Sequence, residues 1–422
     1  MNSRELTRRQ FISRAAAAAA TVTIVPRYCL GGPGAPSNVF REAVIGTGGM
    51  GMGHVTQNKK GDSRRTLAVC DVDKNHLKRS MDKAGSSAKG YGDWREVIAR
   101  DDIDIVRIPT PPHWHALISI AACQAGKDVY SEKPATRFIR EGRVLVDTVK
   151  RYGRVYSINC YGRGGFERWR KLVMSGLLGN PLTVRVSRKH GYNWKVRQWS
   201  GRTYLEPQPV PPQLDYNMWL GPAPYKPYHP HRVHGSFRGY WDYDSGGMGD
   251  MGQHWIDPVQ YLLGKDDTGP VEVKAYAPWP VHPDAVGMWG RVWITYEDGT
   301  RIILDSQEWG EPEEGDHAYI EGPKGRAWRN GRTDPPGLFE KLRDYPNPPR
   351  LVGYYDAVRK RIKPSRRPDV EAAHRSITLL HLSAIAIRTG RTIRWDPVAE
   401  RVIGDEEANR FVNVPMRAPW HL

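Results

Sequence analysis

A chain of 422 residues is long enough to bury a core in each of two domains. Its content of 39% hydrophobic and 26% charged residues is typical of a globular protein and excludes general disorder. The net charge of +17 is scattered and no nucleic-acid-binding motif accompanies it, so we expect no nucleic-acid partner. The chain has fifteen Trp and twenty Tyr but seven Phe. Indole and phenol rings are flat and carry a polar N–H or O–H group, so they suit contact with sugars as well as packing in a core.

The N-terminal segment "TRRQFISRAAAAAATVTIV" places Arg8 and Arg9 before an apolar run from Ala15 to Val25. This order is typical of an export signal, and the paired arginines indicate the twin-arginine route. An ordinary N-terminal helix is the alternative. We therefore expect residues 1–33 to be a signal and linker, the protein to reach the periplasm or cell envelope, and no stable membrane span to remain after signal removal.

Residues 34–160 alternate short apolar runs with amphipathic segments. Strands are predicted at Glu42–Gly48, Thr66–Val72 and Asp102–Pro109, and in "DVYSEKP" and "RVYSINCYG"; helices are predicted at His115–Lys127 and in "REGRVLVDTVKRYG". This alternation indicates βαβ units and a doubly wound parallel sheet of the Rossmann type. The isolated Cys70, Cys123 and Cys160 have no partner spacing and are expected to be buried thiols.

Residues 161–422 have a different pattern of apolar and polar residues. "VEVKAYA" and "MWGRVWITYEDGTRIILDSQEW" alternate with period two, and Asp298-Gly299 is a strong hairpin signal. "LVGYYDAVRKRI" and "VEAAHRSITLLHLSAIAIRTG" have helical spacing. We expect an α/β domain with a large, mostly antiparallel open sheet, followed by C-terminal helices.

The motif "VIGTGGMGMGH" predicts a dinucleotide-binding turn. Gly46, Gly48 and Gly51 are in G-x-G-x-x-G register after a strand, and Gly49 and Met50 lie inside the turn. Glycines allow the backbone to approach a pyrophosphate, whose charge a helix N-terminus stabilises. Asp71 ends the next strand, where a carboxylate binds the ribose hydroxyls and repels a 2′-phosphate. NAD is therefore favoured over NADP.

A lysine ends a later strand of the same sheet, in "SEKPATR". Glu132 and Lys133 lie at the carboxyl edge, where open α/β sheets bind their ligands. A lone lysine is more often a surface residue. Beside a nicotinamide, its cation would assist removal of a hydroxyl proton.

The stretch "SGGMGDMGQHWIDP" places Asp250 and His254 four residues apart, on one face of an expected helix. We expect its glycines to form a turn that precedes the helix, and the carboxylate to orient and charge-stabilise the imidazole. The alternative is a helix-terminal acid beside a packed histidine. A metal site at His254 and Asp257 lacks a third ligand, so no metal is predicted.

These motifs, with "DIDIVRIPTPPHWH", resemble the glucose–fructose oxidoreductase/inositol dehydrogenase (Gfo/Idh/MocA) family from about residue 40 onward. "LDYNMWLGPAPYKPYHP", "DEEANR" and "MRAPWHL" are similar to its exported branch. The resemblance implies a homo-oligomer, a dimer or tetramer joined through the open sheet. It also implies NAD(P)-dependent oxidation or reduction of a sugar or cyclitol, with Lys133, Asp250 and His254 as the catalytic set.

Further candidates follow from their places beside strand ends. Thr110 and His115 are expected in the cofactor pocket, and substrate contacts are considered for Trp114, Tyr161, Arg163, His190 and Trp194. For the substrate set, packing or surface placement is equally open.

Three functions remain at this point. The first is a dehydrogenase that acts on a secondary hydroxyl of a small carbohydrate. The second is a redox-assisted glycoside lyase or glycosidase, in which tightly bound NAD is recycled internally. The third is a non-catalytic sugar-binding protein, against which the intact Lys133, Asp250 and His254 set argues.

Overall fold

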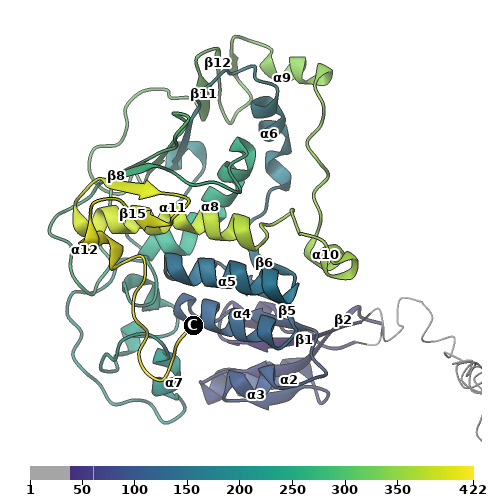
Figure 1. Cartoon of the computed structure of the whole chain (residues 1–422). Helices are drawn as coiled ribbons and strands as arrows, with labels where there is room; N and C mark the ends of the chain where they lie inside the picture. The colour runs from purple at the N-terminus through teal and green to yellow at the C-terminus, as the bar shows by residue number, and fades with distance from the viewer. Residues whose placement is uncertain (1–38, 60) are drawn as a thin grey trace, which may run out of the picture.

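The computed structural model describes residues 39–59 and 61–422 (Figure 1). The signal and linker predicted at residues 1–33 lie outside the described residues. Among the helices of the described part, none combines the length and the apolar character that crossing a bilayer requires.

The first domain is a six-stranded parallel sheet in the order β3-β2-β1-β4-β5-β6. Its strands are β1 (Phe40–Ile45), β2 (Arg64–Cys70), β3 (Lys89–Tyr91), β4 (Ile105–Ile108), β5 (Asp128–Glu132) and β6 (Tyr156–Asn159). Its helices are α2 (Lys74–Ala84), α3 (Trp94–Ile98), α4 (His115–Gln124) and α5 (Ile139–Tyr152). All residues of β4 and β5 are buried, as in a sheet covered on both faces. The predicted Rossmann architecture is confirmed.

The second domain contains a nine-stranded sheet in the order β13-β12-β11-β7-β10-β9-β8-β14-β15. Its strands are β7 (Thr183–Ser187), β8 (Glu272–Tyr276), β9 (Arg291–Thr295), β10 (Arg301–Asp305), β11 (Ile320–Gly322), β12 (Gly325–Ala327), β13 (Thr333–Asp334), β14 (Ile393–Asp396) and β15 (Arg401–Val402). Neighbouring strands are antiparallel except for the β7–β10 pair. The β9–β10 hairpin turns at Gly299, whose φ of +81° is readily adopted by glycine. This mostly antiparallel sheet also confirms the prediction.

The remaining helices belong to the second half of the chain. They are α6 (Glu167–Met174), α7 (Tyr216–Leu220), α8 (Gly246–Leu263), α9 (Leu338–Lys341), α10 (Tyr354–Lys360), α11 (Val370–Thr389) and α12 (Glu406–Asn409). Helix α11 contacts both α5 and α8, and therefore joins the two halves of the molecule (Figure 1).

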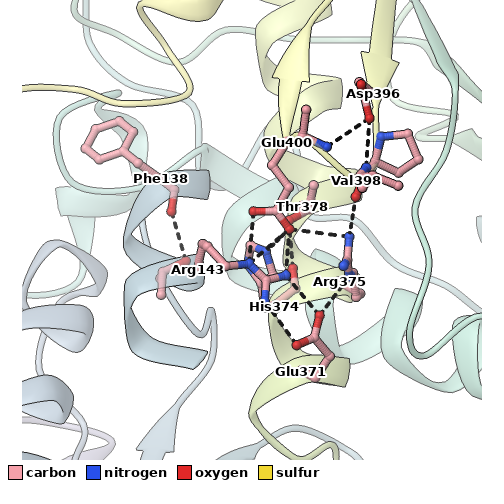
Figure 2. A network of polar contacts seen from close by, with 12 residues as sticks. Phe138, Arg143, Glu371, His374, Arg375, Thr378, Asp396, Val398 and Glu400 are labelled. Atoms are coloured by element: carbon pink, nitrogen blue, oxygen red, sulfur yellow. Dashed lines mark hydrogen bonds and ion pairs between the residues drawn. The ribbon is translucent and has the colours of Figure 1, made fainter. Parts of the chain in front are cut away.

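A half-buried polar network fastens α5 to α11 (Figure 2). Arg143 on α5 donates to Glu371 at 2.9 Å and to Glu400 at 2.6 Å. His374 on α11 lies 2.9 Å from the same Glu400 oxygen. Because these hydrogen bonds involve charged groups, they hold the two domains in one orientation.

Helix α8 differs from its prediction, because the glycines do not form a turn before it. The helix begins at Gly246, so Gly247 and Gly249 lie within its first turns. A Cβ at Gly247 would stand 2.1 Å from the carbonyl oxygen of Trp194, and one at Gly249 would stand 1.8 Å from Asp244 Oδ1. These glycines are needed for close packing, because they allow the start of α8 to lie against Trp194 and Asp244.

Candidate functional site

The carboxyl edge of the first sheet borders a cavity of about 420 Å³. Its walls include the predicted cofactor residues Gly46, Gly48, Gly49, Met50, Asp71, Thr110, Glu132 and Lys133, together with Asp250 from the second domain. Ligands of open α/β sheets bind at this edge, where the strand order reverses. The structure therefore brings most of the predicted cofactor set to one cavity.

The glycine turn has the close backbone packing that a dinucleotide site requires. Gly46 has a φ of +92°, and a Cβ at Gly51 would stand 1.9 Å from the Gly46 carbonyl oxygen. No heavy atom lies within 4 Å of the place where a Cβ at Gly49 would stand. The turn therefore leaves room above Gly49 for an approaching phosphate.

The carboxylate of Asp71 is oriented by its neighbours at the end of β2. Oδ2 accepts a hydrogen bond from the Thr47 backbone at 2.7 Å, and Oδ1 accepts one from the Asp73 backbone at 2.9 Å. His76 Nδ1 lies 3.6 Å from Oδ2, and hydrogen bonding to Asp71 raises the pKa of this imidazole. A carboxylate held in this way is placed to accept hydrogen bonds from ribose hydroxyls.

Two buried polar atoms of cavity-lining residues support a bound dinucleotide. Trp94 Nε1 and Thr110 Oγ1 have no hydrogen-bond partner in the described structure. Because buried donors and acceptors are normally satisfied, each calls for a partner from outside the chain. The glycine turn, Asp71 and these two atoms together fit NAD.

Lys133 and Asp250 meet at the domain boundary. Lys133 Nζ donates to Asp250 Oδ1 at 2.7 Å and to the Asp250 carbonyl oxygen at 2.5 Å. Arg238 Nε donates to the same carboxylate at 2.6 Å. Burial raises the pKa of the Asp250 carboxyl, but the charges of Lys133 and Arg238 outweigh it and lower the pKa to about 2. Asp250 is therefore a carboxylate shared by two cations.

This pairing differs from the expected pairing of Asp250 with His254, although the charge of Asp250 still opposes the lowering of that imidazole's pKa. Its hydrogen bonds in the described structure go to Lys133 and Arg238, and none joins it to His254. His254 lies one helical turn further on, and it is absent from the cavity wall. The i, i+4 spacing placed both residues on α8, but the partners of Asp250 come from other elements.

His254 is oriented by an aromatic neighbour. The ring of Tyr161 is stacked on it, with centroids 3.9 Å apart and planes 8° apart. Burial and the charge of Lys133 lower the pKa of the imidazole to about 3. Its Nδ1 has no hydrogen-bond partner among the described residues. His254 is therefore neutral near pH 7 and retains a free nitrogen lone pair.

Residues 205–243, called the covering segment below, form one part of the cavity wall. Lys74 donates its backbone N–H to Gln213 at 3.0 Å, and Asp215 donates its own to Val72 at 3.0 Å. The segment contributes Met218, His234, Phe237 and Arg238, among others, to the cavity wall. Its apolar side chains form their own buried cluster. The segment is thus a packed wall that is fastened to the first domain beside the cavity.

The C-terminal end of the chain reinforces this wall. Arg417 donates to the Asn217 side chain at 2.8 Å, and the ring of Trp420 lies 4.8 Å from that of Trp114. Figure 1 shows the C-terminus lying against the first domain. Trp114 lines the cavity, and its Nε1 donates to the Trp219 carbonyl oxygen at 3.1 Å.

Other predicted contacts lie elsewhere. His115 is buried behind the cavity wall, with its nitrogens 2.6 Å and 2.8 Å from the carbonyl oxygens of Pro134 and Thr110. Trp194 is fully buried and donates to the Val186 carbonyl oxygen. Arg163 is buried in ion pairs with Asp257 and Asp266. These three side chains support the fold, because their polar atoms are used inside the protein. Tyr161 is 62% exposed, and His190 lines a second cavity.

A group of potential metal ligands lies at the Asp71 end of the first cavity. Asp73, His76 and His234 each place a ligand atom within 4.8 Å of the others. The prediction of no metal site considered only His254 and Asp257. The three residues also line the cavity beside Asp71, so they belong to the same site.

Comparison with known proteins agrees with this geometry. Residues 40–160 match the oxidoreductase family's NAD-binding Rossmann fold, and residues 165–422 match its C-terminal alpha/beta domain. The chain belongs to the Gfo/Idh/MocA oxidoreductase family. Its first domain is therefore an NAD-binding domain, and the sequence resemblance is confirmed at the level of the family.

Curated relatives of this family member include glycosidases and a sugar dehydrogenase. A glycosyl hydrolase family 109 protein of Shewanella sp. strain ANA-3 is 32% identical over 174 residues, which cover 39% of this chain and 38% of that protein. A levoglucosan dehydrogenase of Pseudarthrobacter phenanthrenivorans is 30% identical over 190 residues, 43% of this chain and 40% of that protein. This chain thus spans well under half of each relative's length.

Solved structures share the fold. The WlbA dehydrogenase of Bordetella pertussis, in complex with NADH and UDP-GlcNAcA, has a TM-score of 0.56 and 19% identity, covering 85% of this chain and 99% of that one. The myo-inositol 2-dehydrogenase of Lactobacillus plantarum has a TM-score of 0.51 and 15% identity, covering 84% and 99%. At these identities the likeness shows the architecture alone.

Sequence reasoning missed several residues of the site. Arg238, His234 and Met218 belong to the covering segment, whose proline-rich neighbourhood carries no spacing that points to a cofactor. Trp94 follows β3 and could have been suspected only from its place after a strand. What these residues share is their position in the fold, and the sequence alone does not show that position.

Proposed function

We propose that this protein is an NAD-dependent oxidoreductase that acts on a secondary hydroxyl, or the corresponding ketone, of a sugar, glycoside or cyclitol. One observation carries the proposal: the Lys133 ammonium, paired with Asp250, lies in the wall of the same cavity as the glycine turn and Asp71. A bound NAD would accept hydride from the carbon that bears the hydroxyl.

Lys133 has the role of positioning the hydroxyl oxygen. An ammonium has three N–H donors, and Asp250 accepts two of them. The third is left for a substrate oxygen. Because Asp250 is shared with Arg238, the cation at Lys133 is held at the domain boundary.

His254 has the role of accepting the hydroxyl proton, although its side chain does not line the cofactor cavity: it follows Asp250 on α8 and lies close enough to Lys133, which does line the cavity, for that cation to lower its pKa. Its neutral ring can take a proton, and stacking on Tyr161 holds the plane of the ring. Proton acceptance is favoured when the oxygen becomes more acidic beside the Lys133 cation.

The second candidate is a redox-assisted glycosidase or lyase with retained NAD. The covering segment supports this function, because a packed wall beside the cavity slows exchange of the cofactor. A dehydrogenase that makes net product must release its reduced cofactor, whereas internal recycling has no such need.

The two candidates are separated by one experiment. The protein is purified without added cofactor, NAD and NADH are released by denaturation and counted, and sugars and glycosides are then screened. Net absorbance change at 340 nm with added NAD supports the dehydrogenase. Glycoside cleavage at constant absorbance supports the second candidate. Bound NAD without either activity would indicate a sugar-binding protein.

Two properties of the whole protein are proposed on the sequence features given above. Export by the twin-arginine route rests on Arg8 and Arg9, and is tested by fractionating cells that express the wild type and an Arg8→Lys/Arg9→Lys variant. Assembly as a dimer or tetramer through the nine-stranded sheet is tested by light scattering.

A further inference from the structure

A second cavity of about 330 Å³ lies in the nine-stranded domain, apart from the cofactor cavity. It is formed where β7 and β10 end and where the β12–β13 hairpin turns. Its wall includes His190, Asp305, Gln307, Trp328, Arg329 and Asn330. None of these residues lines the first cavity.

The polar groups of this second cavity are held in fixed orientations. Gln307 accepts a hydrogen bond from the Lys189 backbone at 2.8 Å, and Asn330 accepts one from the Arg332 backbone at 3.0 Å. Each amide uses its oxygen in this way, so its NH₂ group remains as a donor. Arg329 is steadied by a 2.7 Å hydrogen bond from Nη1 to the Tyr192 hydroxyl.

The charges of the cavity favour a neutral or anionic ligand over a cationic one. Its acidic groups are already paired within the protein: Asp305 with Arg291 at 3.1 Å, Glu313 with Arg185 at 3.1 Å, and Asp316 with Arg332. Lys189 and Arg329 add cations to the wall, and neither pairs with a carboxylate among the described residues.

The remaining wall offers amide donors and imidazole, without an uncompensated acidic cluster. Trp328 is a fixed part of this wall, because its Nε1 donates to Asp316 at 3.1 Å and the Arg332 guanidinium lies 3.8 Å from the centre of its ring. Hydroxyl groups both donate and accept hydrogen bonds. A polyhydroxylated ligand matches this wall.

A continuous set of side-chain contacts leads from His254 to this second cavity. Tyr161 is stacked on His254, and its ring lies 5.0 Å from that of Trp255. Trp255 contacts Tyr192 at 5.3 Å, and Tyr192 binds Arg329 of the cavity wall. Tyr161 and Arg329 are exposed and Trp255 is half-buried, whereas Tyr192 is buried beneath them, so the two ends of the route lie at the surface.

We propose that the second cavity is a sugar-binding subsite that holds a further unit of an oligosaccharide or glycoside. The reacting unit lies at Lys133 and His254, and the chain of the substrate follows Tyr161 and Trp255. The placement of the reacting unit rests on the proposed function, whereas sugar binding in the second cavity does not. The substrate class is thereby narrowed to sugars with more than one unit.

The test is calorimetric binding to the intact protein as purified. The probes are maltotriose, cellotriose, xylotriose and tri-N-acetylchitotriose, each compared with its monosaccharide. We expect at least one trisaccharide to bind tenfold or more tightly than its monosaccharide. Trp328→Ala should bring that affinity down to the monosaccharide level and leave monosaccharide binding unchanged.

A conservative variant separates binding from folding. Asn330→Asp keeps the oxygen that accepts the Arg332 N–H and removes the NH₂ donor, so it should weaken trisaccharide binding about threefold to tenfold with an unchanged melting temperature. Trp279→Ala is the matched control, because this indole is 61% exposed and lines neither cavity.

Equal affinity for every trisaccharide and its monosaccharide, including no binding of either, overturns the subsite. So does retention of trisaccharide selectivity in both cavity variants. Selective binding that both variants lose, in a protein without redox activity, would uphold the subsite and reject the proposed function. Redox activity on monosaccharides without trisaccharide selectivity would uphold the proposed function and reject the subsite.

Discussion

Lys133 Nζ lies 2.7 Å from Asp250 Oδ1, although 117 positions separate the two residues in the chain. Lys133 follows β5 of the first domain, and Asp250 lies in the first half of α8. Both side chains are buried, with exposed fractions of 8% and 7%. A buried ion pair is retained only with good geometry, and here the pair joins the domains beside the cofactor cavity.

Replacing Lys133 by Met tests the positioning role. The variant keeps a side chain of similar length but removes the cation, so we expect kcat to fall at least about 100-fold. The amount of NAD that copurifies should stay near the wild-type level, because the glycine turn and Asp71 are unchanged. Lys265→Met is the control, since Lys265 pairs with Asp298 in the β9–β10 hairpin. Full activity of the Lys133 variant would contradict the role.

Replacing His254 by Ala tests the proton acceptor. Turnover should fall by about 10²- to 10⁴-fold with cofactor affinity nearly unchanged. Tyr161→Phe keeps the ring that is stacked on His254, whereas Tyr161→Ala removes it. If Tyr161 positions the imidazole, the Ala variant loses kcat and the Phe variant does not. Unaltered turnover in His254→Ala would reject the mechanism.

The pH dependence follows from the low pKa of His254. Burial and Lys133 lower it from 6.5 to about 3, so the ring stays neutral throughout the neutral and mildly acidic range. The kcat/KM profile should therefore lack an acid limb near the ordinary histidine pKa. An acid limb that His254→Gln abolishes would contradict this expectation.

The same shift affects stability. In the unfolded chain the imidazole titrates near 6.5, so the unfolded state binds more protons between that pH and about 3. The free energy of unfolding should decrease as pH falls through this window. Urea titrations of the wild type and His254→Gln at several pH values measure the difference.

Replacing Asp71 tests cofactor selection. An Asp71→Ser variant loses the carboxylate that faces the ribose, so NAD should bind about tenfold or more weakly. NADP should lose less affinity or gain it, because repulsion of the 2′-phosphate is removed. Fluorescence titration with both dinucleotides gives the ratio. An unchanged ratio would show that Asp71 does not select the cofactor.

The network in Figure 2 predicts how far the free energy of unfolding falls when a contact between α5 and α11 is removed. Arg143→Ala leaves Glu371 and Glu400 without this partner and should lower the free energy of unfolding by about 2 kcal/mol. Arg41→Ala is the control, because its pair with Asp104 is exposed and worth less than about 1 kcal/mol. Chemical denaturation measures both. Equal losses would show that the network has no special role.

The sequence predicted those features that depend on residues close together in the chain. The period of the apolar residues predicted both sheets, and Asp298-Gly299 predicted the β9–β10 hairpin. The glycine turn and Asp71 were found because a pyrophosphate needs backbone approach and a ribose needs an acceptor at neighbouring strand ends. The helical spacing of Asp250 and His254 was correct, although the helix begins earlier than expected.

Only the tertiary structure decided how these parts combine. Helix α8 packs against the residues that follow β5 and against the covering segment, so Asp250 pairs with Lys133 and Arg238 while His254 is stacked on Tyr161. Trp194 and Arg163, candidates by position, became parts of the core because their polar atoms found partners inside it. Such pairings depend on long-range burial and on competition among all available partners. Local sequence patterns do not contain that information.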